Sequence, residues 1–190
     1  DAVLTHLVTV QPCRLADTRI GDGVERLDAH TIRVQAGGRC GLPASPAAVE
    51  ISIVSVESSA PGFTTAYPAG TRRPLASNVN YRPGQIRANA AITEVGPNGS
   101  FDVYTTSGDV VIDTTGAFVE GPATSAGRLV PIPPRRLLDT RTATAVAPGS
   151  TVHVPLPDDG ASDAIALSLV ITVTESEGPG CVTTYPSGTQ

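Results

Sequence analysis

The chain has 190 residues, enough for one or two small domains, and its 40% apolar and 16% charged residues exclude a disordered chain. A net charge of −5 disfavours nucleic-acid binding, because phosphate contacts need a basic face. We find no apolar run near the ~20 residues of a membrane span and no signal peptide at Asp1, so we expect a soluble mature chain without a membrane span.

Two cysteines lie in the first part of the chain, Cys13 and Cys40. A bridge between them would stabilise the fold by roughly 3–4 kcal/mol, as in many secreted β-domains. We therefore expect a Cys13–Cys40 disulfide and an oxidising compartment, and the alternative is two buried thiols in a cytosolic protein. The cysteines and histidines lack the spacing of a zinc site, and we predict neither a metal nor another cofactor.

Alternation of apolar and polar residues predicts β-strands along the chain. Ala48–Ser58 and Ala166–Ser176 alternate in this way, which indicates strands with one buried face. Ser100–Val103 alternates too and follows the Asn-Gly of Gly96–Gly99, a strong hairpin signal. We predict an antiparallel meander from about Ala88 to Val119.

The fold class predicted from these patterns is all-β. No segment of helical length has apolar residues three and four apart, and Gly and Pro interrupt nearly every window. We expect tandem compact repeats of roughly eight short strands each, in the manner of known β-sandwiches or barrels. The periodicity does not decide between the sandwich and the barrel.

The chain contains an internal repeat. The octapeptide PCRLADTR, Pro12–Arg19, returns as PRRLLDTR, Pro134–Arg141. The segment PGFTTAYPAGT, Pro61–Thr71, returns as PGCVTTYPSGT, Pro179–Thr189, in the same order. Two matches in one order indicate a duplication, in which the loop after Asp-Thr-Arg has shortened.

This duplication predicts a complete β-repeat over residues 1–124 and the N-terminal half of a second over residues 125–190. The second copy stops shortly after its Tyr-Pro turn. We expect counterparts of Arg73–Gly96 and Ser100–Glu120 to follow Gln190, unless something else completes the half-repeat.

The repeated Arg-Leu-x-Asp-Thr-Arg motif has two interpretations. Its aspartate can accept charge-assisted hydrogen bonds from the flanking arginines and backbone amides and so hold a loop. Alternatively, the arginines form a site for an anion or a sugar acid. A feature that occurs once per repeat is more often structural, so we predict a structural ion pair in each copy. Its residues are Arg14, Asp17, Arg19, Arg136, Asp139 and Arg141.

Further segments extend the pattern: CGLPA (Cys40–Ala44), YPAGTRRPLASNVNY (Tyr67–Tyr81), GQIRANAAI (Gly84–Ile92) and VVIDTTGAFV (Val110–Val119). With the octapeptide, they resemble the Arg-Leu-x-Asp-Thr-Arg tandem β-repeats of secreted and cell-surface proteins of high-GC Gram-positive, actinobacterial-type bacteria. The resemblance implies an extracellular accessory or structural module with no catalytic residues attached to these motifs. Ala117 stands where the family tends to have an aromatic residue.

We find no catalytic pattern and predict that the chain is not an enzyme. His6, His30 and His153 are scattered, and none lies in a nucleophile-elbow or zinc-binding motif. Glu57 and Glu175 occupy equivalent repeat positions, which gives one carboxylate per repeat rather than the facing pair of a glycosidase.

Two other features have structural interpretations. The acidic segment Asp158–Asp163 lacks the regular ligand spacing of a calcium loop and is better explained as a polar turn. The bonds Tyr67-Pro68 and Tyr185-Pro186 are candidates for cis peptide bonds in tight turns.

A carbohydrate site would use Tyr67, Arg72, Arg73, Asn78 and Asn80, the candidate ligand contacts. We expect the two asparagines to face the same way on an extended strand. Trp is absent and aromatic residues make up 4% of the chain, so a platform for stacking sugar rings is poor. Asparagines that bond to neighbouring backbone are the alternative.

Assembly is the other candidate role, because an incomplete sheet exposes backbone groups that invite a further strand. Cys181 replaces Phe63 of the first repeat, so it is either a buried hydrophobe or an inter-chain thiol with an external partner. We predict an extracellular, non-catalytic structural or adhesive repeat protein, a building block of a filament, surface layer or stalk that associates with itself or with neighbouring repeats. The alternative is an accessory module that binds a glycan or the cell wall.

Overall fold

The computed structural model describes residues 5–121, 128, 136–142, 145–156 and 164–189. The chain divides into two units, Asp1–Arg128 and Leu129–Gln190. The first unit contains all the strands of the described part of the chain.

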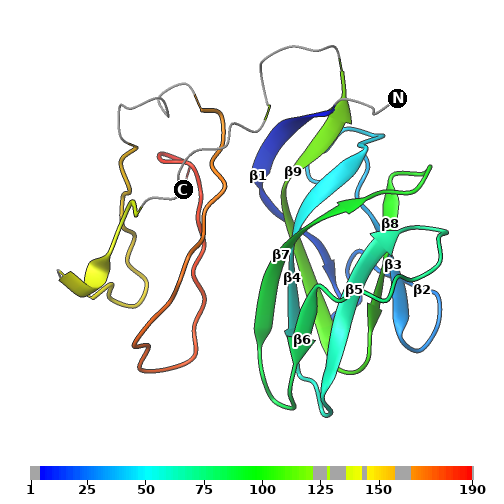
Figure 1. Cartoon of the computed structure of the whole chain (residues 1–190), viewed down its shortest axis with the longest axis horizontal. Helices are drawn as coiled ribbons and strands as arrows, with labels where there is room; N and C mark the ends of the chain where they lie inside the picture. Colours follow the sequence, from blue (N-terminus) through cyan, green and yellow to red (C-terminus); the bar gives the residue numbers. More distant parts are fainter. Residues whose placement is uncertain (1–4, 122–127, 129–135, 143–144, 157–163, 190) are drawn as a thin grey trace. The chain divides into compact units, whose positions relative to one another are not determined.

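The first unit is a β-sandwich, which confirms the predicted all-β class and selects the sandwich over the barrel. Its strands are antiparallel and form two separate sheets (Figure 1). The strands are β1 (Thr5–Asp17), β2 (Glu25–Arg26), β3 (Thr31–Gln35), β4 (Ala48–Val56), β5 (Gly62–Pro68), β6 (Val79–Tyr81), β7 (Arg87–Glu94), β8 (Ser100–Thr105) and β9 (Asp109–Glu120).

The strand order is β1-β9-β4-β7 in the first sheet and β2-β3-β8-β5-β6 in the second. Successive strands β7, β8 and β9 therefore alternate between the sheets, and the predicted meander over Ala88–Val119 is wrong. The Asn-Gly turn is present, since the amide of Gly99 donates to the carbonyl of Gly96 over 2.9 Å. After this turn, however, Ser100 pairs with Gln35 of β3. A turn sequence specifies a change of direction but not the strand that receives the chain.

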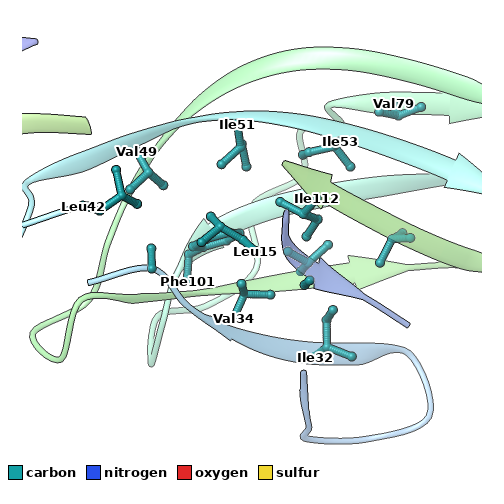
Figure 2. Close-up of a cluster of buried hydrophobic side chains, with 14 of the residues drawn as sticks. Leu15, Ile32, Val34, Leu42, Val49, Ile51, Ile53, Val79, Phe101 and Ile112 are labelled. Atoms are coloured by element: carbon teal, nitrogen blue, oxygen red, sulfur yellow. The ribbon is translucent and has the colours of Figure 1, made fainter. Parts of the chain in front are cut away.

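The core lies between the sheets and depends on β4, which pairs with β9 on one edge and β7 on the other. The alternation predicted for this segment holds, because Val49, Ile51 and Ile53 are 0–1% exposed. They pack in one cluster with Val34 and Phe101 of the second sheet (Figure 2). Removal of this apolar surface from water is the main stabilising contribution that the sandwich makes.

Both Tyr-Pro bonds are trans, so the predicted cis bonds at Tyr67-Pro68 and Tyr185-Pro186 are wrong. The reversal occurs one step later, in the turns Pro68–Thr71 and Pro186–Thr189. In each turn the threonine amide donates to the proline carbonyl, over 3.2 and 3.3 Å. The glycine of each turn has a positive φ, 78° and 81°, and this provides the tight bend without a cis bond.

The described part of the second unit holds one 3-10 helix, η1 (Thr140–Thr142), and no strand. The strand predicted over Ala166–Ser176 is therefore not formed as a hydrogen-bonded element. Its counterpart β4 is paired by β7 and β9, and residues 129–190 contain no counterparts of those strands. Without counterparts of β7 and β9, the backbone groups of residues 166–176 lack strand partners for their hydrogen bonds.

The expected disulfide joins Cys13 to Cys40, with 5.7 Å between the two Cα atoms. Cys13 lies at an irregularity in the pairing of β1 with β9, and Cys40 lies in the connection between β3 and β4. The bridge therefore links the edge strand of the first sheet to the segment that crosses between the sheets.

We predict that the double variant Cys13→Ser/Cys40→Ser loses roughly 3–4 kcal/mol of unfolding free energy, because the open loop gives the unfolded chain more freedom. Urea unfolding followed by circular dichroism measures this loss. The matched control is Cys181→Ser, whose thiol is unbridged and exposed and whose replacement should change the free energy by less than about 0.5 kcal/mol. Equal stability of the double variant and the control would contradict the prediction.

Candidate functional site

The first Arg-Leu-x-Asp-Thr-Arg motif forms a closed ion-pair loop at the end of β1. Asp17 is 2% exposed and accepts hydrogen bonds from Arg14 Nη1 over 2.9 Å and from Arg19 Nη2 over 2.6 Å. Its other oxygen accepts from Arg19 Nε over 2.9 Å and from the Arg19 amide over 3.1 Å. The carboxylate thus exchanges water for three guanidinium hydrogen bonds and one backbone hydrogen bond, which compensates its burial.

The remaining motif residues tie the loop to the sandwich. Leu15 is fully buried in the core cluster. Thr18 exchanges hydrogen bonds with β9: its hydroxyl accepts from the Val110 amide over 2.9 Å and donates to Asp109 over 2.6 Å. Arg14 also pairs with Asp113 of β9. The motif therefore adds side-chain bonds to the backbone pairing that joins β1 and β9 along their length.

The second motif reproduces the same local geometry. Asp139 accepts from the Arg141 amide over 3.1 Å, from Arg141 Nε over 2.9 Å and from Arg141 Nη2 over 2.6 Å, the distances seen in the first copy. Arg136 Nη1 donates to the same carboxylate. Because the described residues of this unit form no strand, the Asp-Thr-Arg turn forms from its own residues without a β-sheet behind it.

This geometry favours the structural interpretation of the motif over an anion site. Arg19 directs two of its nitrogens at Asp17, and Arg14 shares its guanidinium between Asp17 and Asp113. The arginine hydrogen bonds hold the pKa of Asp17 below its ordinary value, with the side chain of Arg19 as the largest cause. The same cause lowers the pKa of Asp139 beside Arg141.

A separate concave site lies on the outer face of the second sheet and has a volume of about 540 Å³. Three of the candidate ligand contacts meet there: Tyr67 of β5, and Arg72 and Arg73 of the connection between β5 and β6. The opposite wall comes from the turn between β2 and β3, including His30, and the floor includes Tyr104 of β8. The site therefore combines residues that are remote in the sequence.

Tyr104 contacts an arginine and two tilted aromatic rings, of which His30 lines the site and Phe63 does not. The Cζ atom of Arg73 lies 3.8 Å from the centroid of the Tyr104 ring, within cation–π range. Phe63 lies 5.4 Å from Tyr104 between ring centroids, and His30 lies 5.9 Å away on the same measure. Burial raises the pKa of the Tyr67 phenol, with a further contribution from the nearby Asp102 carboxylate.

The two asparagines do not join this site. The Asn78 side-chain oxygen accepts from the amide of Ala66 over 2.7 Å, and the Asn80 side-chain nitrogen donates to the Ser77 hydroxyl over 3.0 Å. Asn78 precedes the short strand β6, whereas Asn80 lies within it and is exposed. Neither asparagine lines the pocket, and the bond from the Ala66 amide to Asn78 agrees with the alternative in which asparagine bonds to neighbouring backbone.

Sequence reasoning missed the other half of the site, above all Asp28, His30 and Tyr104. Their contribution depends on the pairing of β3 with β8 and of β8 with β5, which places Tyr104 between Thr31 and Thr65. A period-two pattern marks Tyr104 as facing away from the core but does not name its neighbours. No local motif in the sequence could have found this set.

Other candidate residues remain apart. Cys181 is exposed with an unbridged thiol, so it is not a buried hydrophobe in the described structure. The segment Asp158–Asp163 lies outside the described residues. Within the ranges that the structure describes, no three His, Cys, Asp or Glu side chains form a group able to hold a metal ion, and no helix has the length and apolarity to cross a bilayer.

The fold and the site define the first unit as an antiparallel, disulfide-linked β-sandwich with an ion-pair loop and an open pocket on one outer face. Comparison with known proteins adds no relative: no family model matches the chain, and neither does any curated protein.

We predict that Asp17→Asn lowers the unfolding free energy at pH 7 by roughly 2–3 kcal/mol, because it removes charged hydrogen bonds from a buried site. The pKa of Asp17 is lowered in the folded state, so its contribution is complete above the unfolded carboxyl pKa and is lost as the pH falls through the folded value. The difference between wild type and variant should therefore shrink below about pH 4.

Urea unfolding of both proteins across this pH range measures the effect. Asp22→Asn is the matched control, since Asp22 is an exposed carboxylate in the neighbouring turn and should cost less than about 0.5 kcal/mol. A difference between wild type and Asp17→Asn that is independent of pH would contradict the ionic role of Asp17.

Proposed function

We propose that this chain is an extracellular, non-catalytic structural repeat protein, a building block of a filament, surface layer or adhesive stalk in which residues 164–189 pair with strands of neighbouring repeats. Pairing between repeats of different chains would link those chains into such an assembly. When an interface joins different surfaces of two copies and does not close into a ring, it extends without limit.

One contrast between equivalent residues carries the proposal. Leu167, Leu169 and Ile171 align with Val49, Ile51 and Ile53 of β4. The first-repeat residues are 0–1% exposed, whereas their counterparts are 38%, 49% and 53% exposed. The second set keeps the alternation and apolar character of a core strand without a core around it. Burial of these side chains by a partner would stabilise a complex by roughly 1.5–3 kcal/mol for each one fully covered.

An available edge in the first unit gives further support. Strand β7 ends the first sheet and is paired only on the side of β4 (Figure 1). Its residues are mostly exposed, and charged side chains stand only at its ends, Arg87 and Glu94. An edge strand without interior charges or prolines is open to pairing with another strand. A neighbouring copy could add residues 166–176 at this edge.

The extracellular location rests on the Cys13–Cys40 bridge, because disulfides persist mainly in oxidising compartments. The resemblance to Arg-Leu-x-Asp-Thr-Arg repeats of secreted and cell-surface proteins points to the same location. The structural ion-pair loops agree with a role in which each repeat contributes stability rather than chemistry.

We predict that the wild-type chain self-associates and that Ile171→Asp weakens the association at least ten-fold, because a charge would enter an apolar contact. The matched control is Val170→Asp. Val170 is the adjacent residue, 95% exposed, and corresponds to Ser52 on the outward face of β4, so it should change the association less than two-fold.

Sedimentation velocity over a concentration series measures these constants, and electron microscopy of the non-reduced material shows whether the assembly is a filament. A wild-type chain that stays monomeric at high concentration would overturn the proposal. So would equal weakening by the two aspartate variants, since that outcome would reflect charge alone.

A further inference from the structure

We propose that the pocket on the outer face of the second sheet binds an acidic sugar, a saccharide unit whose carboxylate is held by Arg72 and Arg73. The inference is independent of self-association, because every residue that lines the pocket belongs to the first unit. A chain that remained monomeric could still bind such a sugar, and a chain that assembled could fail to bind it.

The position of the pocket is unusual for a sandwich, whose outer faces normally meet solvent directly. Here the connection between β5 and β6 lies beside the outward side chains of the sheet and borders an open depression of about 540 Å³. That volume is comparable to the ~300–1,000 Å³ of small-molecule sites, but the depression is open to solvent, which suits one unit of a longer polysaccharide. The rim residues Arg72, Arg73 and Leu75 are exposed, so a sugar within a longer polysaccharide can reach the site.

The charge of the pocket favours an anion. The nearby Arg33 and Asp102 neutralise one another in a bidentate pair with distances of 2.8 and 3.0 Å. None of the ion pairs among the described residues includes Arg72 or Arg73. The lining contains one carboxylate, Asp28, against the two guanidinium groups of Arg72 and Arg73, so the pocket carries a net positive charge in a chain whose net charge is −5.

Arg73 is also oriented in advance. Its guanidinium lies over the Tyr104 ring at 3.8 Å, and this contact fixes a side chain that would otherwise be free in solvent. A planar guanidinium whose face rests on a ring keeps the N–H groups of its edge available for the two oxygens of a carboxylate. Less rotational freedom is then lost when the ligand binds.

The other lining groups suit sugar hydroxyls. Asp28 supplies carboxylate oxygens, although one of them already accepts from the His30 amide over 2.7 Å. Thr31 and Tyr67 are 8% and 7% exposed, and the Thr31 hydroxyl interacts with both Asp28 and Tyr67, so these two hydroxyls order the base of the pocket. Leu75 offers apolar surface for the C–H face of a ring. An arginine fork combined with acceptors and hydroxyls matches a ligand that carries one carboxylate and several hydroxyls, such as a hexuronic acid.

The test is isothermal titration of the 190-residue chain with four probes: an oligogalacturonate, an oligoglucuronate, a neutral oligosaccharide of matched length, and inorganic phosphate. We expect at least one acidic oligosaccharide to bind at least ten-fold more tightly than the neutral one and than phosphate. Raised ionic strength should weaken this binding, since part of the attraction is between exposed charges.

The variants locate the site. Arg73→Ala should weaken binding of the acidic oligosaccharide at least ten-fold, and Arg73→Lys should fail to restore it because an ammonium lacks the planar fork. Arg72→Ala should also weaken it. The control variant is Arg82→Ala, which removes the same charge. Arg82 is exposed, lies in the turn before β7 and does not line the pocket, so this variant should leave the affinity for the acidic oligosaccharide within two-fold of wild type. Circular dichroism confirms that each variant is folded.

Several outcomes would overturn the inference. Failure of all four probes to bind would do so, as would equal affinity for the neutral oligosaccharide. Binding by phosphate as tight as by the acidic sugar would show a simple anion site instead. Equal losses in Arg73→Ala and Arg82→Ala would show a diffuse effect of net charge rather than this pocket.

Discussion

Strand β4 needs a neighbour on each edge and a second sheet across its face before its apolar side chains leave water. In the first unit β9 and β7 supply the neighbours, and the sheet that contains β3 and β8 supplies the cover. Because β7 and β9 come much later in the chain than β4, the core forms only when the whole repeat is present. The same requirement explains why an equivalent sequence in residues 129–190 retains its alternation but not its burial.

Unlike β4, the Asp-Thr-Arg turn does not need distant strands for its hydrogen bonds. Its hydrogen bonds join residues two or three positions apart, and the distances around Asp139 repeat those around Asp17, which lies in a strand, whereas Asp139 does not. Local bonds of this kind survive without the sandwich, whereas the attachment of Thr18 to β9 requires it. Each repeat therefore combines a turn that forms by itself with strands that depend on distant partners.

The pocket depends on strand pairing and on the connection between β5 and β6. Strand pairing places Tyr104 on the outer face of the second sheet, and the connection that carries Arg73 then lies over it. The arginines of the ion-pair loops are held by Asp17 and Asp139, whereas no ion pair among the described residues includes Arg72 or Arg73. In our proposal, arginine therefore serves stability in the loops and recognition at the pocket. In the proposed assembly, the pocket would recur once for each chain along a filament.

By itself the sequence determined the all-β class, the alternation of β4, the Cys13–Cys40 bridge and the ion-pair turn, because these follow from period-two patterns and from contacts between recognisable residues. Only the tertiary structure decided the strand order, the trans state of Tyr67-Pro68 and the composition of the pocket. A local pattern states which face of a strand is apolar and where the chain turns. It does not state which strand comes alongside, because that choice depends on packing between segments far apart in the chain.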